Sequence, residues 1–344
     1  MNRIFISFII LAATLLGSSS CDKTNDYGWE KPQPKYSEAP KTMARLWKTS
    51  PMDADLTGRE AFFDEIQGYA DACAASTFKS FLSGEDWLSN SLVKYEDILA
   101  CYDTAFNKVL EGIKNDKPAS GEVNIYLLYN MGYVIKTASG CFAVDIFHRR
   151  AAELEPYLDF MCITHIHQDH KSEELIAAMQ AAGKPVLQNF IDTPGYEYTS
   201  EVAKDYEIGK FGIHTFITSH NNDVKKNVPI TVFQIDCGDD SGHFKLMHSG
   251  DSNFIASQFD VTSDIDVYIP RYAPNELTEN NVIGKVFTPK YVLLSHILEL
   301  SHTDPDSSRW TLRQGLTRAS LLDCANTYMP FWGEKLVWEG GILK

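Results

Sequence analysis

Basic residues are scarce in this chain. Its 344 residues include 31 lysines and arginines against 46 aspartates and glutamates, for a formal net charge of −15. An acidic surface repels phosphate backbones and anionic lipid headgroups, so this balance disfavours nucleic acid as a partner. With 44% hydrophobic residues, the chain is long enough for one large domain with an appendage, or for two small domains.

Paired cysteine motifs are missing as well. The seven cysteines contain no CxxC pair, which excludes a zinc ribbon. Most of those beyond Cys21 lie in apolar runs, where a buried thiol is as good an expectation as a disulfide. Cys73 and Cys101 fall on apolar stripes of helical spacing, so they either form a helix-to-helix disulfide or remain thiols in the core.

Long apolar runs are also rare, and the one that matters lies at the N-terminus. Residues 4–17 follow the single cation Arg3, are too short to span a bilayer comfortably, and have the layout of a secretory signal. The small residues before Cys21 resemble a bacterial lipoprotein signal, although Ser18 stands where leucine is usual. We therefore expect residues 1–20 to be a signal peptide and Cys21 to be lipidated; the alternatives are cleavage without lipidation and an unusual membrane anchor.

This N-terminus predicts where the protein resides. A lipidated Cys21 implies export and anchoring in the bacterial cell envelope, on the periplasmic or surface side. The membrane would then be contacted through the lipid anchor only.

Three further segments differ in pattern. Residues 21–50 are polar, proline-bearing and aperiodic, which predicts a tether. Residues 51–120 carry apolar side chains at helical spacing in two runs, which predicts a helical extension. In residues 121–344, strand-like runs combine with few helices, which predicts a layered α/β domain. Because the apolar stripes of the extension are too extensive to leave in water, we expect it to pack on this domain and to wall a substrate groove with aromatic side chains.

Within the predicted α/β domain, the first elements follow from the spacing of apolar residues. Residues 123–137 are predicted as one strand, 141–147 as the next and 157–164 as a third. Residues 171–183 then form a predicted amphipathic helix that ends at Gly183.

The stretch THIHQDH, residues 164–170, concentrates three of the ten histidines behind a predicted strand. His165 and His167 alternate along an extended segment, so their side chains can point the same way. Asp169 and His170 are adjacent at the start of the predicted helix, so they can serve a neighbouring metal ion. Imidazole and carboxylate ligands suit zinc, and also manganese or iron. A chance histidine-rich turn is the alternative, but it predicts no matching ligands downstream.

Matching residues do follow, and with them residues 121–344 resemble the metallo-β-lactamase superfamily of metal-dependent hydrolases. Its ordered motifs correspond to an aspartate after an early strand, the cluster itself, a histidine at a strand end, an aspartate after glycine, and a histidine ending a late strand. Outside the cluster these are Asp145, His220, Asp251 and His296. The resemblance implies a four-layer αβ/βα sandwich, here with an N-terminal helical extension.

The resemblance also implies a set of ligands and a chemistry. One metal ion would be held by His165, His167 and His220, and the other by Asp169, His170 and His296, with Asp251 between them. The two divalent ions, most readily Zn2+ but also manganese or iron, would share a hydroxide that attacks the substrate. Asp169 would act as the catalytic carboxylate by orienting that hydroxide or taking its proton.

Four further residues are candidates for supporting roles. Asp145 is expected to orient a ligand histidine or the cluster turn rather than to bind metal. Glu299 and His302 follow His296 at helical spacing, and His248 lies three positions before Asp251. Each of these three either supports the centre or substrate, or occupies an ordinary structural position.

Two functions from different classes are compatible with this sequence. The first is a metal-dependent hydrolase that cleaves an ester, lactone or phosphodiester bond in a small-molecule or lipid-like substrate. The family's β-lactamases carry cysteine where this chain has Asp251, so antibiotic hydrolysis is not favoured. The second is a non-enzymatic envelope lipoprotein that keeps the fold and binds a ligand or partner. A complete set of seven ligands favours the enzyme, because a binding module has no chemical need for all seven.

Overall fold

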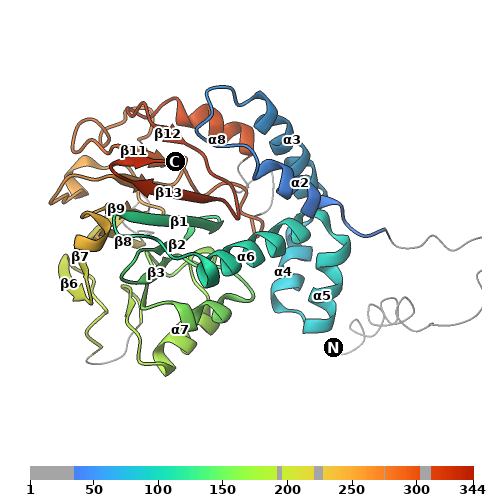
Figure 1. The fold of residues 1–344 in the computed structure, drawn as a ribbon, viewed down its shortest axis with the longest axis horizontal. Helices are drawn as coiled ribbons and strands as arrows, with labels where there is room; N and C mark the ends of the chain where they lie inside the picture. The colour runs from blue at the N-terminus through green and yellow to red at the C-terminus, as the bar shows by residue number, and fades with distance from the viewer. Residues whose placement is uncertain (1–34, 192–195, 221–227, 275, 303–310) are drawn as a thin grey trace, which may run out of the picture. The chain divides into compact units, whose positions relative to one another are not determined.

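Two seven-stranded β-sheets form the centre of the computed structural model, which describes residues 35–191, 196–220, 228–274, 276–302 and 311–344 (Figure 1). The predicted signal peptide, Cys21 and the first part of the predicted tether lie outside the described residues. Residues 37–344 form one compact unit. Across the described residues, no helix is both long enough and apolar enough to cross a membrane.

The first sheet has the strand order β14-β13-β1-β2-β3-β4-β5. Its strands are β1 (Glu122–Tyr129), β2 (Gly132–Lys136), β3 (Cys141–Val144), β4 (Phe160–Cys162), β5 (Val186–Leu187), β13 (Lys335–Glu339) and β14 (Ile342–Leu343). Strands β1, β2 and β3 are antiparallel neighbours, and β4 and β5 continue the sheet in parallel with β3. The carboxyl ends of β3 and β4 therefore meet at one edge.

The second sheet has the strand order β12-β11-β10-β9-β8-β7-β6. Its strands are β6 (Lys204–Ile208), β7 (Phe211–Ser219), β8 (Pro229–Asp236), β9 (Lys245–His248), β10 (Val267–Ile269), β11 (Tyr291–Leu293) and β12 (Thr327–Tyr328). Strands β6 to β9 are antiparallel neighbours, whereas β9, β10, β11 and β12 run parallel. Segments that follow β9, β10 and β11 thus leave the sheet at the same edge.

The strands of the first sheet are apolar on both faces because both faces are covered. In β1, Ile125 and Leu127 belong to the core between the sheets, whereas Tyr126 and Leu128 belong to the core under the helices. This alternation follows from the two-residue period of a strand. Between the sheets, the ring of Phe211 in β7 lies 5.4 Å from that of Phe142 in β3.

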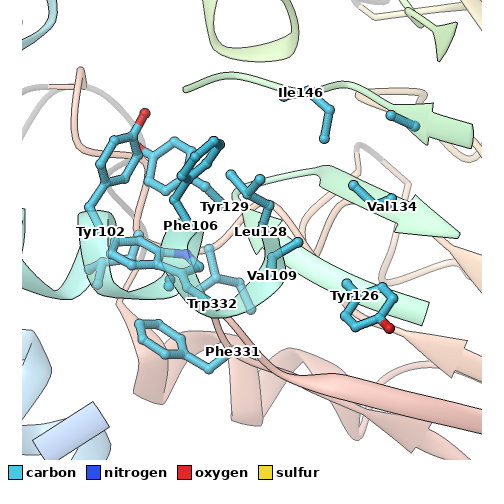
Figure 2. Packing of buried hydrophobic residues seen from close by; sticks show 14 of the residues in the cluster. Tyr102, Phe106, Val109, Tyr126, Leu128, Tyr129, Val134, Ile146, Phe331 and Trp332 are labelled. Carbon is cyan, nitrogen blue, oxygen red and sulfur yellow. The ribbon is translucent and has the colours of Figure 1, made fainter. Parts of the chain in front are cut away.

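The predicted extension forms four helices and packs on the first sheet mainly through the last of them. They are α3 (Thr57–Ala72), α4 (Ala75–Ser83), α5 (Asp86–Tyr95) and α6 (Asp97–Asn115). Helix α6 lies against β1, and Figure 2 shows its Tyr102 and Phe106 beside Tyr129 and Trp332. The rings of Tyr102 and Tyr129 are 4.8 Å apart in an edge-to-face arrangement. The expected packing of the extension on the α/β domain is confirmed.

Both outer faces of the sandwich are covered. Helix α7 (Glu173–Ala181) packs near β5 on the first sheet, and Gly183 follows it with a φ of 69°, as the sequence predicted. On the second sheet, Phe259 before β10 and Phe287 after it cover the outer face: the ring of Phe259 lies 5.8 Å from that of Phe216, and the ring of Phe287 lies 5.1 Å from that of Tyr268. The short helix α8 (Leu312–Ala319) packs on α3.

The tether prediction is wrong for its last part. Residues Ala39–Leu46 form helix α2, in which Ala39, Met43 and Leu46 are completely buried. A proline in its first turn is tolerated because the N–H there has no partner within the helix. Next to this helix, the Trp47 Nε1 donates a hydrogen bond of 2.9 Å to the Trp332 carbonyl oxygen. Three apolar residues at helical spacing therefore join this polar stretch to the core.

Two other expectations need correction. The run 123–137 is a hairpin and not one strand, because Asn130 adopts a φ of 55° and the chain reverses between β1 and β2. The extension contains four helices rather than two runs, with breaks after Ala72, Ser83 and Tyr95. Of the two outcomes left open for Cys73 and Cys101, the structure shows no disulfide between them, and both side chains are buried in the core. Burial raises the pKa of the Cys101 thiol, so it behaves as an apolar side chain.

Candidate metal centre

All seven predicted ligands lie just beyond the ends of strands. His165 follows β4, His220 follows β7, Asp251 follows β9 and His296 follows β11. Their ligand atoms gather into two groups, and within each group these atoms lie within 4.8 Å of one another. The groups are His165, His167, His220 and Asp251, and Asp169, His170 and His296. Residues up to 131 positions apart in sequence are therefore brought together by the two sheets.

Asp251 lies between the two groups. Its Oδ2 is 3.1 Å from the His220 Nε2 and 4.0 Å from the His165 Nε2. Its Oδ1 is 3.5 Å from the His170 Nε2 and 3.4 Å from the His296 Nε2. The Oδ2 of Asp251 thus faces the first group and its Oδ1 faces the second. In this position the carboxylate could contribute one oxygen to each of two cations.

The second group is closed by Asp169. Its Oδ2 is 3.2 Å from the His296 Nε2 and 3.3 Å from the His170 Nε2. Asp169 and His170 lie in a single 3-10 turn, Gln168–His170, directly before α7. This turn lets two consecutive residues reach the same point.

The chemistry of these atoms fits two divalent cations. In the described part of the chain, the Nε2 atoms of His165 and His170 and the Oδ1 of Asp251 are buried without a hydrogen-bond partner. Leaving a buried polar atom unpaired costs roughly 1–3 kcal/mol. Cations placed between these atoms would satisfy all three at once, which hydrogen bonds within the protein do not.

The protonation states of His165, His167 and Asp251 also suit metal binding. Burial and the neighbouring His170 lower the pKa of His165 well below its ordinary value, and burial and His220 lower the pKa of His167. Burial would raise the pKa of Asp251, but the surrounding histidines outweigh it and hold this pKa well below its usual range. Neutral imidazoles and ionised carboxylates are the forms that bind metal ions.

His170 and His296 have the opposite shift. Burial lowers the pKa of each, but Asp169 and Asp251 outweigh burial and raise both values. This part of the centre therefore attracts positive charge.

Asp145 supports the cluster from behind. Its Oδ2 lies 2.8 Å from the His170 Nδ1, and its two oxygens accept hydrogen bonds of 2.8 and 2.7 Å from the backbone N and the Oγ1 of Thr164. Because the Nδ1 of His170 faces Asp145, the Nε2 is the nitrogen directed at the centre. Asp145 holds a φ of 51°, a conformation that aspartate tolerates better than most residues.

Comparisons with known proteins find similarity among solved structures, while no family model and no curated protein matches the sequence. The chain is similar to a metallo-beta-lactamase fold protein of Bacillus subtilis, with 16% identity over 64% of this chain and 100% of that one and a TM-score of 0.46. It is also similar to a metallo hydrolase of Ignicoccus hospitalis, with 16% identity over 63% and 99% of the chains and a TM-score of 0.44. A third is a diiron beta-hydroxylase of Streptomyces venezuelae, with 13% identity over 64% and 54% and a TM-score of 0.45.

The architecture is consistent with the metallo-β-lactamase sandwich. The paired sheets and their covered outer faces agree with it. With TM-scores below 0.5, these similarities carry no argument about the activity or the substrate of this chain.

The glycine that precedes Asp251, Gly250, is required at its position for steric reasons. Gly250 has a φ of 47°, and a Cβ at this position would lie 2.3 Å from the Thr164 Oγ1. Because Thr164 donates to Asp145, a side chain at residue 250 would push apart the turns that carry Asp251 and the cluster. Glycine permits both the positive φ and the close approach.

Asn130 was not anticipated from the sequence. Its Nδ2 donates a hydrogen bond of 3.2 Å to the Asp169 Oδ2, and its carbonyl oxygen accepts one of 3.2 Å from the His296 N. It therefore positions one ligand from each of two distant segments. The available signal was a lone asparagine and a glycine interrupting an apolar run, which is typical of a hairpin turn.

The other three supporting candidates lie around the centre. His248 is fully buried behind Asp145, with its Nε2 2.9 Å from the Met131 carbonyl oxygen, so it braces the hairpin turn. Glu299 is fully buried and accepts hydrogen bonds from the Tyr129 hydroxyl and from the N atoms of Ser301 and His302. His302 is partly exposed, and its ring lies 6.2 Å from that of His296. None of the three is among the clustered ligand atoms of the described residues.

A cavity of about 440 Å³ adjoins the ligand turn. Helix α4 contributes Lys79, Leu82 and Ser83 to its lining, and Gln168 and Lys171 contribute from the side of the turn. The extension therefore walls this cavity, but not with the aromatic side chains that we expected. Several of the extension's aromatic side chains pack instead in the core, as Figure 2 shows for Tyr102 and Phe106, whereas Trp87 and Tyr95 are exposed.

Proposed function

We propose that this protein is a metal-dependent hydrolase that cleaves an ester, lactone or phosphodiester bond. The observation that carries the proposal is the pair of adjoining ligand groups with Asp251 between them. The unpaired buried Nε2 atoms of His165 and His170 support it, because they have no structural use without a cation. A protein that only binds a partner through its surface would not need them.

Each residue of the centre then has a defined task. His165, His167 and His220 would hold one cation, Asp169, His170 and His296 the other, and Asp251 both. Two bound cations acidify a water molecule and polarise the carbonyl or phosphoryl oxygen of the substrate. Asp169 is kept ionised despite its burial, chiefly by His170, and Asn130 fixes its Oδ2. Asp169 would then orient the attacking water or accept its proton.

Zinc is the metal we propose, because histidine with few carboxylates is a common zinc ligand set. Manganese and iron use the same ligands and are the alternatives. The proposed location is the cell envelope, reached by the signal peptide and held by the lipid on Cys21, which would place a small-molecule or lipid-like substrate within reach.

Metal analysis with ligand variants tests the function. We expect the purified protein, reconstituted with zinc, to contain about two ions per chain and to hydrolyse at least one member of a panel of aryl esters, lactones and phosphodiesters. His165→Ala and Asp251→Ala should each lose metal and activity, because the remaining ligands are left unpaired. His214→Ala is the control, since His214 lies near the surface beside Asp205. Absence of metal from the wild-type chain after reconstitution with zinc, manganese and iron would refute the proposal.

A further inference from the structure

Arg271 lies at the same edge of the sheet as the metal ligands. It follows β10, which pairs in parallel with β9 and with β11. Asp251 follows β9 and His296 follows β11, so Arg271 leaves the sheet between them, with neighbouring strands about 4.8 Å away. It also forms an isolated bridge with Ser295, the residue before His296.

The guanidinium of Arg271 is held by a neutral side chain. Its Nη2 donates to the Oδ1 of Asn253, two residues after Asp251. Asn253 is fully buried, and its N donates a hydrogen bond of 3.1 Å to the carbonyl oxygen of Ser219, next to His220. Arg271 is thus anchored on the turn that carries the bridging carboxylate.

The charge of Arg271 has no carboxylate partner in the described part of the chain. No carboxylate oxygen there lies within ion-pair distance of it, and its Nε is buried without a hydrogen-bond partner. Burial lowers the pKa of Arg271, whereas the nearby Asp251 and Glu276 raise it. An arginine remains protonated at neutral pH in any case. Arg271 is partly buried, and a partly buried cation with a buried, unpaired donor is costly unless an anion completes its shell.

We propose that Arg271 binds an oxyanion of the substrate, a carboxylate or phosphate group, beside the metal centre. The inference rests on the proposed function and narrows it to anionic esters or phosphodiesters. Guanidinium pairs with carboxylate and phosphate oxygens through two parallel hydrogen bonds, which gives geometric selection as well as attraction. The chain has a net charge of −15 and would repel such an anionic substrate. The fixed positive charge of Arg271 at this edge would offset that repulsion.

Binding of inorganic phosphate to the zinc-loaded, full-length protein gives the first test, by calorimetry. We expect Arg271→Met to weaken phosphate binding about 10- to 100-fold, the range for one lost charged hydrogen bond. Arg271→Lys, which keeps the charge but not the fork, should lie in between. Arg45→Met is the control, because Arg45 lies on α2 and pairs with Glu65. Zinc content and thermal stability are measured for each variant, and they should match those of the wild type.

Hydrolysis of a matched pair of substrates gives the second test. The pair is p-nitrophenyl butyrate and the p-nitrophenyl monoester of glutaric acid, which differ by one carboxylate. Arg271→Met should lower kcat/KM for the anionic ester about 10- to 100-fold and change that for the neutral ester by less than about threefold. Equal phosphate affinity and an unchanged ratio between the two esters in a metal-loaded Arg271→Met variant would overturn the inference.

The tests also separate the failure of this inference from that of the hydrolase proposal. A wild-type chain that binds zinc and phosphate but hydrolyses no ester contradicts the hydrolase proposal, and the phosphate titration still decides the role of Arg271. If Arg271→Met and Arg271→Lys both lose zinc or stability, Arg271 is a structural tie to Asn253 and the inference is wrong.

Discussion

The buried ion pair between Arg59 and Glu334 joins helix α3 to the segment before β13. Their exposed fractions are 2% and 5%, and two hydrogen bonds of 2.6 Å connect the guanidinium to the two carboxylate oxygens. Arg59→Met keeps most of the apolar stem but removes the charge. Glu334 then retains the backbone N of Phe331, at 2.7 Å, as a donor. The carboxylate would be left buried without a cation.

The size of the effect follows from that isolated charge. Removing one partner of a buried ion pair costs about 3–5 kcal/mol, because the other charge stays desolvated. With an unfolding entropy of about 2.1 cal/mol/K per residue over residues 37–344, the melting temperature should fall by about 5–8 °C. Arg59→Met with Glu334→Gln removes both charges, and this double variant should recover most of the loss.

Thermal unfolding followed by circular dichroism and tryptophan fluorescence measures the shift. Arg313→Met is the matched control, because Arg313 also pairs with α3, through Glu60 and Asp64, but is about half exposed. An exposed pair contributes about 0–1 kcal/mol, so this control should shift the melting temperature by less than about 2 °C. Equal shifts for Arg59→Met and Arg313→Met would show that the ion pair does not hold the extension to the sandwich.

Three further perturbations follow from the described residues and the N-terminal sequence. His148 is buried between the rings of Tyr102 and Phe106, and burial holds its pKa well below 6.5. The unfolded chain therefore takes up a proton below pH 6.5 that the folded chain does not, so stability should fall by up to about 1.4 kcal/mol per pH unit on acidification. Urea unfolding from pH 7.5 to 5 should show a smaller fall for His148→Phe, and parallel curves for the two proteins would contradict this. Gly250→Ala should weaken metal affinity about 10- to 100-fold through the clash with Thr164. Gly242→Ala is its control, with a φ of 67° and no atom within 4 Å of the added Cβ, so equal zinc affinities in the two would refute the steric argument. Cys21→Ser should move the protein from the membrane fraction to the soluble fraction, and retention of the variant in membranes would argue against lipidation.

Local patterns in the sequence predicted a layered α/β domain and the ligand cluster at residues 164–170, and the resemblance to a known family added the sandwich and the three remaining ligands that the structure gathers. Residue types with metal affinity stood in a fixed order, each after a strand-like run, and the ends of such strands meet at one edge. The end of α7 at Gly183 was equally readable, because a glycine with positive φ stops a helix without help from distant residues.

Long-range packing decided what those patterns did not show. Helix α2 has eight residues, too few to be stable alone, and it forms because α3 and α6 cover its apolar stripe. Asn130 meets Asp169 across 39 positions and Arg59 meets Glu334 across 275, and no local spacing marks either pair. A sequence motif indicates which side chains can bind an ion. The residues that orient these side chains come from other segments of the chain, so only the tertiary structure determines how the ligands are oriented.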